Sequence, residues 1–77
     1  MERITRADVD RIAQTVSDKL PAGYRLQVQG RNGYFGLDRY KGDVMLDVVR
    51  TGTKRDLYTY LQGMRAAQLL ADLPNHV

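Results

Sequence analysis

The 77-residue chain contains no cysteine and only one histidine, His76. Without cysteine it can form neither a disulfide bond nor a thiolate metal site. A lone histidine in a predicted tail over residues 74–77 cannot build a histidine-based catalytic triad. We therefore expect no enzymatic activity, and we expect stability to come from one small apolar core or from self-association.

Long apolar runs are also absent, since no stretch approaches the roughly 18 residues that a membrane-spanning helix needs. The first ten residues, MERITRADVD, are charged and lack the apolar centre of a signal peptide. These absences predict a protein with no membrane segment and a cytoplasmic location.

Neither basic nor acidic residues are in large excess, because the net charge is only +3. The excess of basic residues lies in the middle of the chain and permits nucleic-acid contact without requiring it. Acidic residues are few, and Asp38, Asp43 and Asp47 are close in sequence, as ligands of a hard cation can be. We interpret them as turn chemistry and as partners of neighbouring basic residues, and we expect no metal or cofactor.

Two amphipathic helices are predicted, over residues of about 5–20 and 53–73. Each begins with a Thr-x-x-Asp capping pattern, Thr5 to Asp8 and Thr53 to Asp56. Apolar residues then recur at spacings of three and four. In the first helix they are Val9, Ile12, Ala13, Val16 and Leu20, and in the second Leu57, Tyr60, Leu61, Met64, Ala67 and Ala71.

Three strands are predicted between the helices, over residues of about 24–29, 34–40 and 44–49. Their side chains alternate in polarity, and the glycine-containing segments GRNG and KGD between them are typical of hairpin turns. We expect Phe35 and Leu37 to point inward, together with Val44, Leu46 and Val48 from the third strand.

The order α-β-β-β-α with short connections predicts a single α+β domain. We expect a three-stranded antiparallel meander with both helices packed on one face. The other face would then carry a mixed set of residues: Arg25, Gln27, Tyr34, Asp38, Tyr40, Met45, Asp47 and Val49.

Three binding surfaces follow from this arrangement. A protein partner would contact the mixed face through Tyr34, Tyr40, Met45 and Val49. Nucleic acid is the alternative, bound by the residues Arg31, Lys54, Arg55 and Tyr58 through phosphate contacts and base stacking. A homodimer would use the last three leucines, Leu69, Leu70 and Leu73.

The stretch Gly52-Thr53-Lys54 lacks the glycine-rich loop and the hydroxyl residue after lysine that a phosphate-binding P-loop needs. We interpret Gly52 as a bend and Thr53 as a helix cap, which leaves Lys54, Arg55 and Tyr58 without an assigned structural role.

Three segments resemble a set of small phage and prophage proteins. They are ITRADV from Ile4, NGYFGL from Asn32 and TKRDLYTYLQG from Thr53, so the resemblance covers nearly the whole chain. Those proteins have no assigned activity. The resemblance implies an accessory protein that binds a host or phage macromolecule, with inhibition of a host defence as one use.

The element order is similar to that of double-stranded RNA-binding domains, whose second helix also opens with basic residues. Here Thr53, Lys54 and Arg55 match that feature, but Asp56 interrupts the basic cluster and the GRNG hairpin lacks proline and histidine. The similarity is one of topology and supports the nucleic-acid alternative.

Overall fold

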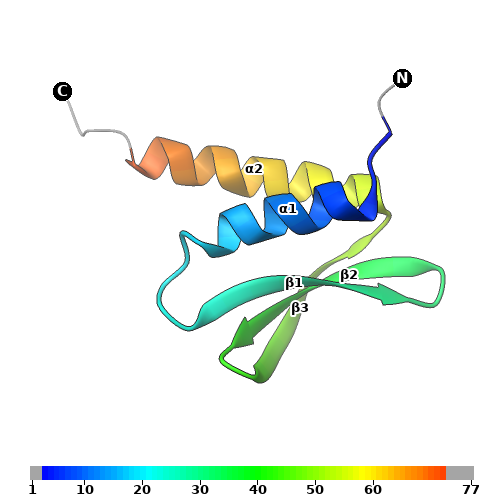
Figure 1. The fold of residues 1–77 in the computed structure, drawn as a ribbon, viewed down its shortest axis with the longest axis horizontal. Coiled ribbons are helices and arrows are strands. Elements are labelled where there is room, and N and C mark those ends of the chain that lie inside the picture. Colours follow the sequence, from blue (N-terminus) through cyan, green and yellow to red (C-terminus); the bar gives the residue numbers. More distant parts are fainter. Residues whose placement is uncertain (1–2, 73–77) are drawn as a thin grey trace.

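The computed structural model describes residues 3–72 and has the element order α-β-β-β-α (Figure 1). The elements are α1 (Arg6–Ser17), β1 (Tyr24–Arg31), β2 (Tyr34–Lys41), β3 (Val44–Gly52) and α2 (Lys54–Asp72). The strands form one antiparallel meander in the order β1-β2-β3. Both helices lie on the same side of this sheet, so the predicted α+β fold is confirmed.

Both helices begin at the predicted capping residues. The Thr5 Oγ1 accepts a hydrogen bond of 3.2 Å from the Asp8 N–H, while the Asp8 carboxylate accepts one of 2.9 Å from the Thr5 N–H. Thr53 and Asp56 make the same reciprocal pair at the start of α2, with distances of 3.1 and 2.9 Å. Each pair satisfies backbone donors that the first helical turn leaves free.

The pKa of Asp8 is lowered from its ordinary value by these hydrogen bonds from Thr5, and Thr53 lowers the pKa of Asp56 in the same way. The deprotonated carboxylate also interacts favourably with the positive end of the helix dipole. Both helix starts are therefore stabilised by an ionised acid.

The hairpins form where the glycines predicted them. Gly33 and Gly42 have φ angles of +79° and +59°, a region that residues with a side chain rarely adopt. Gly33 follows Asn32 in the first turn, and Gly42 precedes Asp43 in the second. Each pair of strands is therefore joined by a two-residue connection.

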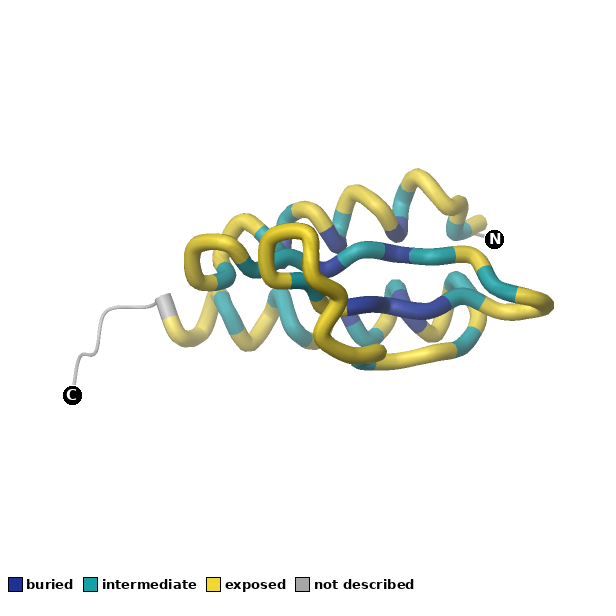
Figure 2. Tube along the Cα trace, turned by 90° about the horizontal axis from the view of Figure 1, so that it is seen from below, coloured by how far each residue is buried: buried dark blue, intermediate teal, exposed yellow. Residues whose placement is uncertain are grey.

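The core consists of eight buried apolar residues between the sheet and the helices. The set is Val9, Ala13, Val16, Leu26, Val28, Leu37, Leu57 and Leu61. It confirms the inward position of Leu37 and the predicted stripes of both helices, except for Ala67 and Ala71, which are exposed. Figure 2 shows that the buried positions follow the helices, β1 and β2, whereas β3 is exposed along most of its length.

The predicted inward face of β3 is wrong. Val44, Leu46 and Val48 are 63%, 45% and 43% exposed, whereas Val49, which was expected to point outward, packs against the core. For Leu46, Val48 and Val49 the cause is two β-bulges, because the register between β2 and β3 shifts twice and leaves Leu46 and Val49 as extra residues of β3. Val44 precedes both bulges and keeps the predicted side, opposite Lys41, but it lies exposed at the start of the edge strand. A bulge breaks the alternation of side chains, so a period of two cannot be read through it.

The two edges of the sheet differ. At the β1 edge, the Leu26 N–H donates to the Ser17 Oγ at 2.9 Å, and the Arg6 guanidinium donates to the Val28 carbonyl oxygen at 2.8 Å. No hydrogen bond from a side chain of residues 3–72 reaches the backbone of β3. Side chains from α1 thus close the β1 edge, and the β3 edge is open.

Candidate functional site

The side of the sheet that faces away from the helices is called the open face here. Strand register assigns residues to it, because directly opposite residues of paired strands share a face. Asp38 lies opposite Gln27 on β1 and opposite Val48 on β3. The same reasoning places the following residues on the open face: Arg25, Gln27, Gln29, Arg31, Tyr34, Gly36, Asp38, Tyr40, Met45, Val48 and Thr51.

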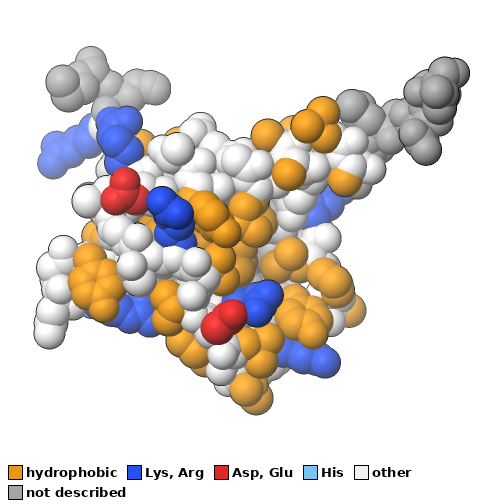
Figure 3. All heavy atoms as spheres, turned by 180° about the vertical axis from the view of Figure 1, so that it is seen from behind, with side chains coloured by type: hydrophobic (Ala, Val, Ile, Leu, Met, Phe, Trp, Pro, Cys, Tyr) orange, Lys and Arg blue, Asp and Glu red, His pale blue; other side chains and the backbone are white. Residues whose placement is uncertain are grey.

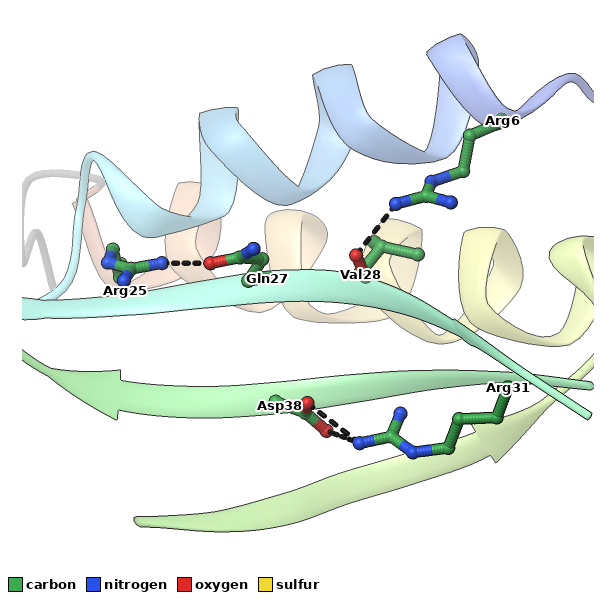
Figure 4. A network of polar contacts seen from close by, with 6 residues as sticks. All are labelled: Arg6, Arg25, Gln27, Val28, Arg31 and Asp38. Carbon is green, nitrogen blue, oxygen red and sulfur yellow. Dashed lines mark hydrogen bonds and ion pairs between the residues drawn. The ribbon is translucent and has the colours of Figure 1, made fainter. Parts of the chain in front are cut away.

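The centre of the open face is an ion pair between Arg31 and Asp38 (Figure 4). The Arg31 Nη2 donates to both carboxylate oxygens of Asp38, at 2.9 and 2.8 Å. The Asp38 residue is only 2% exposed, although it lies on the uncovered side of the sheet. The hydrogen bond with Asp38 raises the pKa of Arg31 above its ordinary value. The arginine therefore remains charged and committed to this carboxylate.

Gly36 makes this ion pair sterically feasible. A Cβ atom at Gly36 would lie 1.8 Å from the Arg31 Nη1 and 2.8 Å from its Cζ. The guanidinium thus lies directly across the glycine backbone on its way to Asp38. A glycine inside a strand often marks such a close approach.

A second group of polar side chains occupies the β1 side of the open face. The Arg25 guanidinium carbon lies 4.3 Å from the centre of the Tyr40 ring, and its Nη1 donates to the Gln27 Oε1 (Figure 4). A cation above a tyrosine ring is attracted by the ring quadrupole. Arg25, like Arg31, therefore has partners within the same face.

Exposed hydrophobic side chains lie beside these paired groups. Tyr34 is exposed at the start of β2, and β3 contributes four more exposed residues that form what we call the apolar rim: Val44, Met45, Leu46 and Val48. Met45 and Val48 of the rim lie on the open face, whereas Val44 lies on the helix side of the sheet. In Figure 3, which views the molecule from behind, hydrophobic side chains reach the surface below the helices with charged ones scattered among them. Clustered exposed apolar residues are typical of protein interaction sites.

The structure brings three of the four predicted protein-binding residues together. Tyr34, Tyr40 and Met45 share the open face. Val49 does not belong to it, because this bulge residue is half-buried and packs against the core. Its predicted place on the outward face was wrong for the same reason as the inward face of β3.

The predicted nucleic-acid residues are divided between two layers. Arg31 lies on the open face and is paired with Asp38, whereas Lys54 and Arg55 begin α2 in the helix layer. Tyr58 is partly buried against the core. Within residues 3–72, the two remaining basic residues of this set, Lys54 and Arg55, have no hydrogen-bond or ion-pair partner.

Two of the leucines predicted for a homodimer, Leu69 and Leu70, are exposed near the end of α2. The third, Leu73, and the predicted tail over residues 74–77 with His76 lie outside the described residues.

Sequence reasoning missed the partnership of Arg31, Gly36 and Asp38. Asp38 was expected on the outward face as a partner of neighbouring basic residues, but it is buried, and its partner Arg31 is seven residues away on β1. The glycine in the middle of a predicted strand was a usable signal, since it indicates close approach of another group. Nothing in a single strand, however, shows which group approaches.

Residues 3–72 contain no group of three or more histidine, aspartate or glutamate side chains placed to hold a metal ion. No described helix is long and apolar enough to cross a membrane. Comparisons of the chain with protein-family models, curated proteins and solved structures give no match.

Proposed function

We propose that the chain is a small phage- or prophage-type accessory protein that acts in the host cytoplasm by binding another protein, without catalysis. Its partner is a host or phage protein, and inhibition of a host defence is one use of such binding. The proposed binding surface is the open face around Tyr34, Tyr40 and Met45.

The main observation behind this proposal is that the charged side chains of the open face are paired with one another, whereas apolar side chains beside them are exposed. Arg31 is paired with Asp38, and Arg25 with Gln27 and the Tyr40 ring. Tyr34 and Met45 remain exposed beside them. Tyrosine, methionine and arginine are enriched in protein interfaces, where unpaired charges are depleted.

Affinity capture from host cells tests the proposal with two variants and a control. Tyr34→Ala and Met45→Ser remove exposed contact groups, whereas Leu70→Ala removes an exposed group of similar size at the far end of α2. We expect the first two variants to lose a partner protein that the wild type and the control retain. Equal recovery of that partner by all four proteins, with unchanged thermal unfolding, would refute the open face as the binding surface.

Nucleic acid remains the second candidate, because Lys54 and Arg55 have no partner within the described chain and lie at a helix N-terminus. The Asp56 carboxylate, which is bonded to the Thr53 N–H, already occupies part of that terminus. This competition makes the second candidate weaker than the first.

Binding to a mixed nucleic-acid pool at low salt separates the two candidates. If phosphates are bound by the start of α2, Lys54→Glu with Arg55→Glu abolishes binding, and the wild-type affinity falls steeply with salt. Arg11→Glu with Lys41→Glu is the matched control, since it makes the same change in charge elsewhere. Equal binding by both double variants would exclude the start of α2.

A further inference from the structure

The outer edge of β3 carries backbone groups that no other strand of the sheet covers. An uncovered edge strand exposes N–H and C=O groups that can pair with another strand. The direction of these groups can be worked out from the register. In an antiparallel pair, residues whose backbone groups face the neighbouring strand alternate with residues whose groups face away.

The hydrogen bond from Leu26 to Ser17 fixes this alternation, because it shows that the Leu26 N–H points away from β2. Leu26 lies opposite Arg39, whose backbone groups must therefore point toward β3. The next residue along β2, Asp38, points its groups back toward β1. Val48 lies opposite Asp38, so the Val48 N–H and C=O point to the open edge.

The residues of β3 on either side of Val48 that point to the open edge are fixed by their partners on β2. Met45 lies opposite Tyr40 and Thr51 lies opposite Gly36, and both residues of β2 direct their backbone groups toward β1. The edge groups of β3 thus belong to Met45, Val48 and Thr51. They are three residues apart rather than two, because one bulge residue lies in each interval.

This spacing selects the strand that can pair with β3. In a regular strand, the groups on one edge recur at every second residue, so they fall out of step with a spacing of three. Bulges protect edges from unwanted pairing in this way. A strand with the same two bulges, placed antiparallel, would stay in step over the whole edge.

We propose that β3 pairs with β3 of a second copy of this chain, antiparallel and centred on Val48. Val48 then lies opposite Val48 of the second copy, and Met45 lies opposite the second copy's Thr51. Every edge group of one strand meets an edge group of the other. Residues on the open face also meet residues on the open face. The product is a continuous six-stranded sheet with two-fold symmetry.

The residues between these positions are complementary in the same register. Leu46 lies opposite Arg50 of the other strand, and Asp47 lies opposite Val49. The diagonal neighbours are therefore Leu46 with Val49 and Asp47 with Arg50, so apolar side chains and opposite charges are brought together twice. Asp47 lies opposite Arg39, and Arg50 lies opposite Leu37. Arg39 and Leu37 are two residues apart on β2, so Asp47 and Arg50 share the helix side of the sheet.

Self-association also suits the size of the core, which has only eight buried residues, while the apolar rim is left exposed along the open edge. Small domains with such cores are commonly stabilised by oligomerisation. Pairing through the edge leaves Tyr34 and Tyr40 uncovered and places two copies of the open face side by side.

A charge exchange tests the register. Asp47→Arg places two arginines diagonally beside each other twice, and Arg50→Asp does the same with aspartates. We expect wild type to shift from 8.8 kDa toward twice that mass as concentration rises in sedimentation equilibrium. Each variant should raise the dissociation constant about tenfold, because two attractive charge pairs become repulsive, and an equimolar mixture of the two should restore the dimer.

Asp47 forms an ion pair with Arg39 of its own chain at 2.7 Å, and Asp10 forms one with Arg6 on α1 at 3.1 Å. Asp10→Arg is therefore the matched control, since it also removes an exposed aspartate that is paired with an arginine. It should dimerise like the wild type. Circular dichroism of each variant checks that the fold is retained. The equimolar mixture separates the proposed pairing from a small loss of folding stability in either variant. Only the proposed pairing predicts that the two variants form a dimer with each other.

Amide hydrogen exchange gives a second readout. Dimer formation should slow exchange at Met45, Val48 and Thr51 in a concentration-dependent way. A wild-type protein that stays at 8.8 kDa up to millimolar concentration overturns the proposal. So does a dimer that survives both charge reversals but is lost in Leu70→Glu. These results do not depend on capture of a partner by Tyr34, so the two proposals can fail separately.

Discussion

Arg31 crosses Gly36 to reach Asp38. Gly36→Ala should therefore destabilise the wild type but stabilise a variant that lacks Arg31. Gly36 does not have a positive φ angle, so alanine fits its backbone conformation. The alanine Cβ, however, would lie 1.8 Å from the Arg31 Nη1, and the guanidinium would have to move away from Asp38. Gly36→Ala should therefore break the ion pair without disturbing the strand.

Two opposing contributions set the size of the effect. A buried carboxylate that loses its hydrogen-bond partner costs about 1–3 kcal/mol, and Asp38 is 2% exposed. Replacement of glycine by alanine gains about 0.4–1 kcal/mol, because the unfolded chain becomes less flexible. In the wild type we expect a net loss of about 1 kcal/mol. In a domain of this size that loss lowers Tm by about 4–8 °C.

The same substitution should be stabilising in an Arg31→Met background, because no ion pair is left to break. There we expect a gain of about 0.4–1 kcal/mol. Urea unfolding of the four proteins of this double-mutant cycle measures both effects. An equal effect of Gly36→Ala in the two backgrounds would refute the reasoning, since the glycine would then have no connection with the arginine.

Further expectations concern the core, the helix caps and the β1 edge. Leu61→Ala should lower the free energy of unfolding by about 2–5 kcal/mol in denaturant titration, since it removes a fully buried side chain, and a loss below 1 kcal/mol would contradict its burial. Because the pKa values of Asp8 and Asp56 are lowered in the folded state, their stabilisation is present above the unfolded value of about 3.8 and lost as pH falls below it. Between pH 5 and pH 2 the free energy of unfolding should fall less in the variant with Asp8→Asn and Asp56→Asn than in wild type, because the variant has no capping carboxylates to protonate. Acid titration measures both curves, and parallel curves would show that the two capping carboxylates do not contribute to the pH dependence. Ser17→Ala removes the acceptor of the Leu26 N–H and should speed exchange of that amide; unchanged exchange would contradict closure of the edge by α1.

Local features of the fold could be predicted from the sequence. The two Thr-x-x-Asp caps, the apolar stripes of both helices and the glycines of the two hairpins all depend on residues within about four positions of one another. Such contacts form within one element and leave a pattern in the chain. Element order and fold class followed from them.

The candidate site was only partly predictable. Tyr34, Tyr40 and Met45 were expected on the uncovered face and lie there. Val49 was misplaced, because its position depends on a bulge. A bulge is a property of two strands in register, so the alternation within one strand cannot reveal it.

The amino-acid sequence by itself determined where each helix and turn begins, since capping groups and glycines act on their own neighbours. Only the tertiary structure decided which side chains of β3 are exposed and that Asp38 is buried beneath Arg31. It also decided that the β1 edge is closed while the β3 edge is open. These outcomes depend on contacts between segments that are distant in the chain, and such contacts exist only once the strands have paired and α1 has packed beside them.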